Sequence, residues 1–131
     1  MYLIVTRSFP PDTGGMQNLM WGLTNSLAKH FMVKVFADQS KNKNLDEKLS
    51  YSVDRIGGPK LIRKYRKAYL VNDFVKNNKN ISGIIADHWK SLELIKTKKK
   101  KICLIHSKEI NHKKGSASNK RLLKAFNNVD Q

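Results

Sequence analysis

The sequence has 131 residues, of which 26 are Lys or Arg and 10 are Asp or Glu, so its formal net charge is +16. This length suits one domain with its own core, and a hydrophobic content of 40% excludes a disordered chain. No apolar run approaches membrane-spanning length, and the single cysteine, Cys103, excludes an intramolecular disulfide. These features favour a cytoplasmic protein, with any membrane contact peripheral.

The first half of the chain alternates short apolar runs with helical or polar segments. Tyr2–Thr6 is continuously apolar, as expected for a strand covered on both faces, and a loop rich in Pro and Gly follows it. From Met16 to Phe31 apolar residues recur with helical spacing. Val33–Ala37 and Tyr51–Ile56 are predicted as the second and third strands.

The second half continues the alternation. The predicted elements are a helix at Lys60–Asn77, a strand at Gly83–Ala86, a short helix ending at Ile95, a strand at Ile102–Ile105, and a helix ending at Phe126 that Ser116 or Ser118 caps. This alternation predicts an α/β fold, a Rossmann-like parallel sheet with helices on both faces. Ligands of such sheets bind beyond the carboxyl ends of the strands, so we expect a site in the loops that follow them.

Two adjacent glycines, Gly14 and Gly15, separate the first strand from the first helix. Without a Cβ, backbone N–H groups here approach an anion closely, and the helix N-terminus adds partial positive charge. A tight turn that binds nothing explains the same pair, and neither a dinucleotide fingerprint nor a P-loop motif is present. His88, after the fourth strand, similarly either lines an acceptor pocket or is structural.

The helix over Lys60–Asn77 opens with a strongly basic segment. An apolar face of Leu61, Ile62, Tyr65, Ala68 and Tyr69 is flanked by the cations Lys60, Arg63, Lys64, Arg66 and Lys67. Basic flanks with boundary aromatics are typical of a helix on an anionic bilayer, where each charge contributes about 1 kcal/mol. An ordinary core-packing helix with a solvated basic rim is the other interpretation.

The excess of positive charge favours anionic partners or reflects a general lysine bias. A non-catalytic module that binds nucleic acid is one hypothesis. However, the cations are scattered over several elements and no aromatic-basic recognition motif is present, so nucleic acid is the less favoured partner. No pair of residues has a convincing metal-ligand spacing, and we expect no metal site.

The Phe-Pro-Pro-Asp-Thr-Gly-Gly-Met-Gln motif at residues 9–17 resembles the opening of family 4 glycosyltransferases, which have the GT-B fold. It is especially similar to bacterial mannosyltransferases that act on phosphatidylinositol and related lipids. The Ile-His-Ser-Lys-Glu segment at residues 105–109 resembles the family's His-Gly-x-Glu stretch, with Ser107 in place of the usual glycine. In element order the resemblance covers nearly the whole chain.

The resemblance implies the N-terminal half of a retaining glycosyltransferase, which transfers a sugar from a nucleotide-sugar to a lipid-linked or cell-envelope glycan acceptor. Gly14 and Gly15 would lie against the donor diphosphate, and Gln17 would reach the acceptor headgroup. His106 would be the catalytic residue that contacts the transferred sugar, and Glu109 would order its loop.

The family's donor-binding residues belong to a second, C-terminal domain, which residues 1–131 lack. The chain alone is therefore expected to be inactive. The nucleotide-sugar is a substrate, so the resemblance implies no cofactor. In lipid-acting members a basic amphipathic helix of this domain docks on the membrane, which favours a peripheral location on its inner face.

Overall fold

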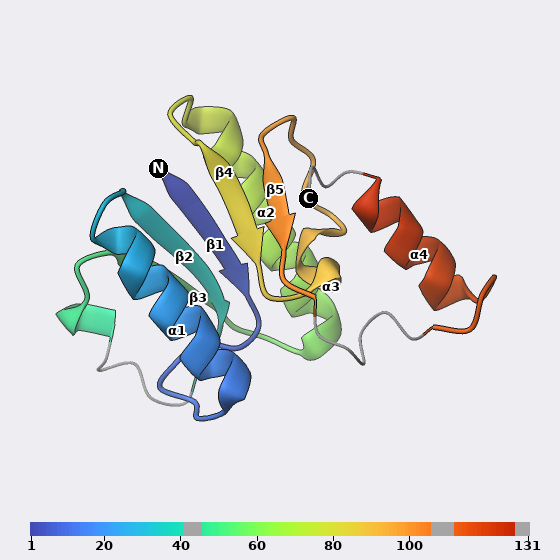
Figure 1. Cartoon of the computed structure of the whole chain (residues 1–131), viewed down its shortest axis with the longest axis horizontal. Coiled ribbons are helices and arrows are strands. Elements are labelled where there is room, and N and C mark those ends of the chain that lie inside the picture. The colour runs from blue at the N-terminus through green and yellow to red at the C-terminus, as the bar shows by residue number, and fades with distance from the viewer. Residues whose placement is uncertain (41–45, 106–111, 128–131) are drawn as a thin grey trace.

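Five strands form one all-parallel sheet in the computed structural model, which describes residues 1–40, 46–105 and 112–127 (Figure 1). The strand order is β3-β2-β1-β4-β5. The strands are β1 at Tyr2–Thr6, β2 at Val33–Asp38, β3 at Ser52–Ile56, β4 at Gly83–Ala86 and β5 at Lys101–Cys103. The predicted Rossmann-like parallel sheet is confirmed.

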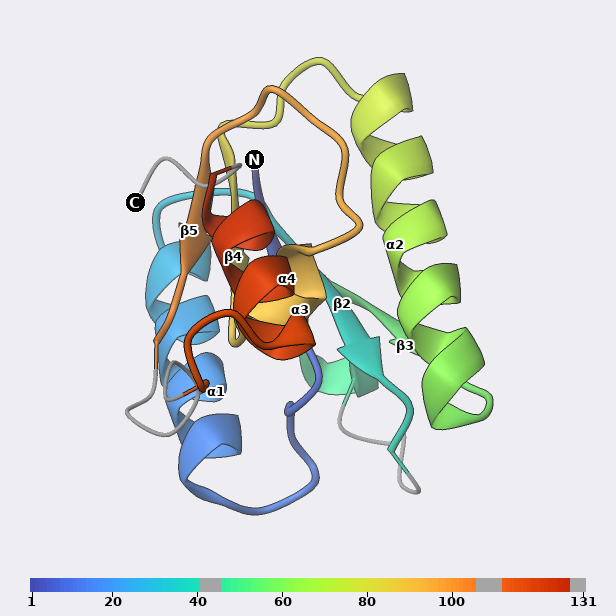
Figure 2. The same cartoon turned by 90° about the vertical axis from the view of Figure 1, so that its right-hand side faces the viewer.

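Helices cover both faces of this sheet (Figure 2). The helices are α1 at Gly15–Ala28, α2 at Lys60–Asn77, α3 at Trp89–Leu92 and α4 at Ala117–Phe126, with a short 3-10 turn at Asp46–Lys48. The first helix lies on one face, α2 and α3 lie on the other, and α4 packs against α3. The predicted helices on both faces are therefore present.

Several boundaries differ from the sequence prediction, and the short helix predicted to end at Ile95 ends at Leu92. The first helix ends at Ala28 rather than Phe31, whose N–H bonds to the Leu27 carbonyl in the turn that follows. The strand β5 ends at Cys103 because β4, its one neighbour among the described strands, ends opposite it at Ala86.

The core has two layers, one on each side of the sheet. Leu3 and Val5 of β1 point into the layer under α2, and Ile4 between them points into the layer under α1. All three side chains are fully buried. A central strand that is buried on both faces has no side exposed to solvent, which explains why the sequence of β1 is one continuous apolar run.

The sheet has a topological switch point between β1 and β4. The chain builds outward from β1 through β2 to β3, and then returns to place β4 and β5 on the other side of β1. The loop after β1 leads to α1 on one face, whereas the loop after β4 leads to α3 on the opposite face. Divergence of two neighbouring loops opens a crevice at the carboxyl edge, where ligands of such sheets bind.

Candidate functional site

A buried carboxylate, that of Asp87, joins the two strands at the switch point. One of its oxygens accepts hydrogen bonds from the Thr6 hydroxyl and the Arg7 backbone N–H, both at 2.8 Å. The other accepts from the Ser91 hydroxyl at 2.9 Å. Asp87 therefore fixes the carboxyl end of β1 relative to the start of α3.

His88 follows Asp87 and caps α3. Its Nδ1 accepts a hydrogen bond from the backbone N–H of Lys90 at 2.9 Å, and its ring lies 5.5 Å from that of Trp89. Only 6% of the residue is exposed. The structural interpretation of His88 accounts for this geometry, and contact with an acceptor stays a prediction.

The Gly14–Gly15 turn opens α1 at the same edge of the sheet (Figure 1). Gly14 has a φ of +155° with extended ψ, a conformation that only glycine adopts readily. A Cβ there would lie 2.5 Å from Oε1 of Gln17, so the Gln17 carboxamide folds back over the turn. At Gly15 an added Cβ would meet no described atom within 4 Å.

Among the residues that the structure describes, no side chain caps the N-terminus of α1, and its first turn contains no acidic residue. Its first backbone N–H groups therefore keep the partial positive charge of a helix end, which favours an anion. The turn is open at Gly15, and no described side chain caps it.

Arg55 of β3 anchors the loop that carries this turn, and sequence reasoning missed it. Its guanidinium makes paired hydrogen bonds to Asp46 at 2.8 and 2.7 Å, also bonds the Pro10 carbonyl, and lies 5.5 Å from the centre of the Phe9 ring. The available signal was an arginine inside a strand, a position that needs a buried partner.

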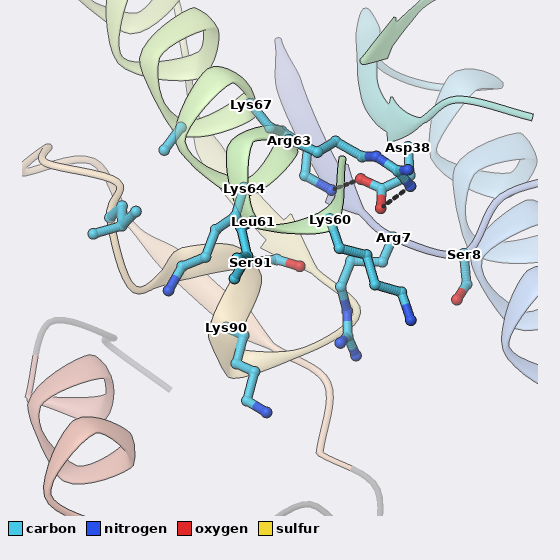
Figure 3. Close-up of a pocket in the computed structure, with 12 residues that line it drawn as sticks. Arg7, Ser8, Asp38, Lys60, Leu61, Arg63, Lys64, Lys67, Lys90 and Ser91 are labelled. Carbon is cyan, nitrogen blue, oxygen red and sulfur yellow. Dashed lines mark hydrogen bonds and ion pairs between the residues drawn. The ribbon is translucent and has the colours of Figure 1, made fainter. Parts of the chain in front are cut away.

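A cavity of about 670 Å³ lies at the carboxyl edge on the opposite face, between α2 and α3 (Figure 3). One carboxylate, that of Asp38 at the end of β2, is part of its lining. Its cationic lining residues are Arg7, Lys60, Arg63, Lys64, Lys67 and Lys90. Arg7 and Lys90 were not predicted as site residues, although each directly follows a predicted strand or its loop.

Asp38 holds two of these cations. Its carboxylate is 2.6 Å from Nζ of Lys67 and 3.1 Å from Nη1 of Arg63. Nζ of Lys67 also donates to the Thr6 carbonyl at 2.7 Å, and only 4% of Lys67 is exposed. Burial lowers the pKa of Lys67, and the charge and hydrogen bond of Asp38 oppose that change. The prediction that Lys67 contacts a membrane is therefore wrong, because its ammonium group faces the strand ends.

Glu93 holds a third cation and links three helices. Its carboxylate accepts hydrogen bonds from Lys64 of α2 and, at 2.7 and 2.8 Å, from Arg121 of α4. The Arg121 hydrogen bonds lower the pKa of Glu93 to about 2, helped by Lys64 and opposed by burial. Lys64 is thus partly committed to an ion pair inside the protein.

The apolar side chains at the start of α2 point outward. Leu61 is 82% exposed, Tyr65 63% and Tyr69 71%, and Ile62 is exposed as well. The helix packs inward instead through Ala68, Val71 and the buried stem of Lys67. The core-packing interpretation of the predicted apolar face is therefore wrong except at Ala68.

The remaining predicted cations are placed differently. Lys60 is exposed at the cavity rim, while Arg63 and Arg66 donate to the carbonyls of Gly58 and Gly57. Arg66 stays exposed on the side of the helix away from the cavity lining.

His106 and Glu109 lie outside the described residues, so their predicted roles stay predictions. Among the residues that the structure does describe, no group of three or more His, Cys, Asp or Glu side chains gathers as a metal site would require. No described helix is both long enough and apolar enough to cross a bilayer.

The sequence matches no protein-family model and no curated protein. The assignment of a function therefore depends on the geometry above and on the motif resemblance.

Proposed function

We propose that this chain is the acceptor-side half of a retaining GT-B glycosyltransferase, which transfers a sugar from a nucleotide-sugar to a lipid-linked or cell-envelope glycan. The observation that carries the proposal is the turn at Gly14–Gly15. A glycine-only conformation leads directly into an uncapped helix N-terminus at the switch-point edge of a parallel sheet. This is where the family motif requires a diphosphate to lie.

The roles follow from these positions. Backbone N–H groups at Gly14 and Gly15 bind the donor diphosphate, and Gln17 turns from its place over Gly14 toward the acceptor. His106 contacts the transferred sugar, and the leaving phosphate takes the acceptor proton on the same face. A C-terminal domain completes the donor site.

Sugar transfer tests this proposal directly. The chain is joined to the donor-binding domain of a phosphatidylinositol mannosyltransferase and incubated with labelled GDP-mannose and a bacterial lipid extract. We expect label in the lipid fraction, and its loss in Gly15→Trp and His106→Ala. Transfer that is unchanged in both variants contradicts the proposal.

A second measurement uses the chain as it is. Pyrophosphate added to the ¹⁵N-labelled chain should shift the amide resonances of Gly14, Gly15 and Met16 and leave those at the C-terminal end of α1 unchanged. A Gly15→Trp variant should lose these shifts. Absence of any shift at the three amides in the unaltered chain contradicts diphosphate binding at this turn.

The outward face of α2 supports an anionic membrane as a further partner under this proposal. Leu61, Ile62, Tyr65 and Tyr69 form an exposed apolar ridge, which we name the α2 ridge, with Lys60 and Arg66 exposed beside it. Exposed apolar patches bordered by cations suit the interface of an anionic bilayer, which takes up the apolar side chains and attracts the charge.

Vesicle binding tests this partner. The chain should bind vesicles rich in phosphatidylglycerol and not vesicles of phosphatidylcholine, and Leu61→Ser/Tyr65→Ser should bind at least about tenfold more weakly, since two large apolar groups are lost. The matched control is Leu19→Ser/Met32→Ser, which removes two exposed apolar side chains elsewhere. Binding to RNA with a steep salt dependence, and none to vesicles, favours the nucleic-acid hypothesis instead.

A further inference from the structure

The cavity between α2 and α3 has more positive charge than its own acids neutralise. Asp38 is shared by Arg63 and Lys67, and Glu93 is shared by Lys64 and Arg121. The three other cations of the lining, Arg7, Lys60 and Lys90, have no carboxylate within ion-pair distance among the described residues.

These three cations come from three different elements. Arg7 follows β1 and is held through its backbone by Asp87, Lys60 begins α2, and Lys90 lies in the first turn of α3. In Figure 3 the Arg7 and Lys60 side chains cross in the view, and the Lys90 side chain extends from α3 below them. Nζ of Lys90 lies 5.3 Å from the centre of the Trp89 ring, which restrains it near the cavity.

The lining also limits what the ligand looks like. Ala68 and Leu94 give the cavity an apolar side, with the exposed Leu61 at its rim, and its volume of about 670 Å³ is that of a site for a small molecule. Three cations without acidic partners match a compact group of about two negative charges better than they match a single carboxylate. A phosphate monoester has that charge near neutral pH and offers three acceptor oxygens.

We propose that this cavity binds a phosphate monoester through Arg7, Lys60 and Lys90. Arg7 supplies a planar fork for two phosphate oxygens, and the two lysines supply point charges. Asp38 and Glu93 hold the other three cations of the lining, so the phosphate competes with no described carboxylate for the three that bind it. The inference is independent of sugar transfer, because it depends on the cavity alone.

Direct titration tests the proposal with sn-glycerol 3-phosphate as the probe and dimethyl phosphate, a diester with a single charge, as its comparison. We expect saturable binding of the monoester, at least about tenfold tighter than the diester because one full charge is lost. Affinity should fall as the pH drops through about 6, where the monoester takes up its second proton. Equal affinity for both probes, or no saturable binding, overturns the proposal.

Two variants that lose the same charge at different places distinguish a specific phosphate site from general electrostatic attraction to a basic protein. Arg7→Gln/Lys60→Gln/Lys90→Gln should weaken monoester binding at least about tenfold. Lys29→Gln/Lys113→Gln/Lys114→Gln removes the same charge from exposed positions outside the cavity and should weaken it less than about twofold. Equal losses in the two variants overturn the proposal. Circular dichroism checks that both variants fold.

A vesicle experiment distinguishes a lipid headgroup from a free phosphate as the ligand. Vesicles that contain phosphatidic acid carry the same monoester on a lipid, so sn-glycerol 3-phosphate should lower binding to them to the level seen with phosphatidylglycerol vesicles if the cavity takes the lipid headgroup. Binding of the soluble probe without displacement from vesicles assigns the cavity to a free phosphate instead. Either result supports the binding of a phosphate monoester in the cavity. Loss of monoester binding together with intact sugar transfer rejects this inference alone.

Discussion

The two long helices beside the switch point differ sharply in charge. No residue of α1 is charged, whereas the first eight residues of α2 include Lys60, Arg63, Lys64, Arg66 and Lys67. Both helices begin at the carboxyl edge of the sheet, on opposite faces. An anion on the α1 side must rely on backbone amides, and one on the α2 side on side-chain cations. Recognition on the α1 side would therefore depend on backbone conformation, and recognition on the α2 side on side-chain charge.

The largest effect is expected on the α2 side. Asp38→Asn removes the carboxylate between Lys67 and Arg63 and leaves a buried ammonium group without its anion. We expect the free energy of unfolding to fall by about 3 kcal/mol, as for other broken buried pairs. Asp54→Asn is the matched control, because Asp54 is 44% exposed in its pair with Lys34 and should cost less than about 1 kcal/mol. Urea unfolding measures both, and equal costs would contradict the assignment.

On the α1 side the corresponding test concerns backbone conformation. Gly14→Ala places a Cβ on a backbone with φ +155° and against the Gln17 carboxamide, and should cost about 2 kcal/mol of unfolding free energy. Gly15→Ala lies in open space at the start of α1 and should cost nothing or stabilise slightly. Thermal unfolding compares the two, and a larger loss at Gly15 would show that the turn has been assigned wrongly.

A smaller effect is expected at the carboxylate that joins α2 to α3 and α4. The pKa of Glu93 is lowered from 4.5 to about 2 in the folded protein. The stabilisation it gives is therefore present above about pH 4.5 and is lost as the pH falls toward 2. Glu93→Gln should lower the unfolding free energy by about 1 kcal/mol at neutral pH and flatten the acid dependence in that window. An unchanged acid profile in the variant would exclude this role.

The smallest effect is expected on the α2 ridge. Leu61→Ala should change the unfolding free energy by less than about 0.5 kcal/mol, since 82% of Leu61 is already exposed. Leu92→Ala, at a position with 4% exposure in the same layer of the protein, should cost about 3 kcal/mol. A large loss for Leu61→Ala would mean that this face of α2 is covered after all.

Much of the fold could be predicted because its elements have strong local signals. The strand at Tyr2–Thr6 and the helix at Lys60–Asn77 have the predicted bounds, since one is a pure apolar run and the other lies between Gly-Pro and Asn-rich breaks. The inward face of α2 was predicted wrongly for a physical reason. The start of this helix lies over polar strand ends rather than over the apolar sheet, so Lys67 turns inward to Asp38 and Leu61 turns outward.

The candidate site was predictable only where it depends on local conformation. A glycine pair between a strand and a helix marks a turn in the sequence itself, and Gly14 does adopt a glycine-only conformation. The cavity was not predictable in the same way. Asp38 and Glu93 pair with some of the lining cations and not with Arg7, Lys60 or Lys90. These pairs join elements that are distant in the sequence, so residue spacing does not predict them.

The position of Trp89 has a practical consequence. This indole is 1% exposed, lies under Lys90, which lines the cavity, and is covered by Leu122 and Ala125 of α4. The second tryptophan, Trp21, packs beside Phe9 on the far face of the sheet. The protein therefore contains one tryptophan on each face of its sheet. Replacing either with Phe leaves an emission signal that reports on one face alone.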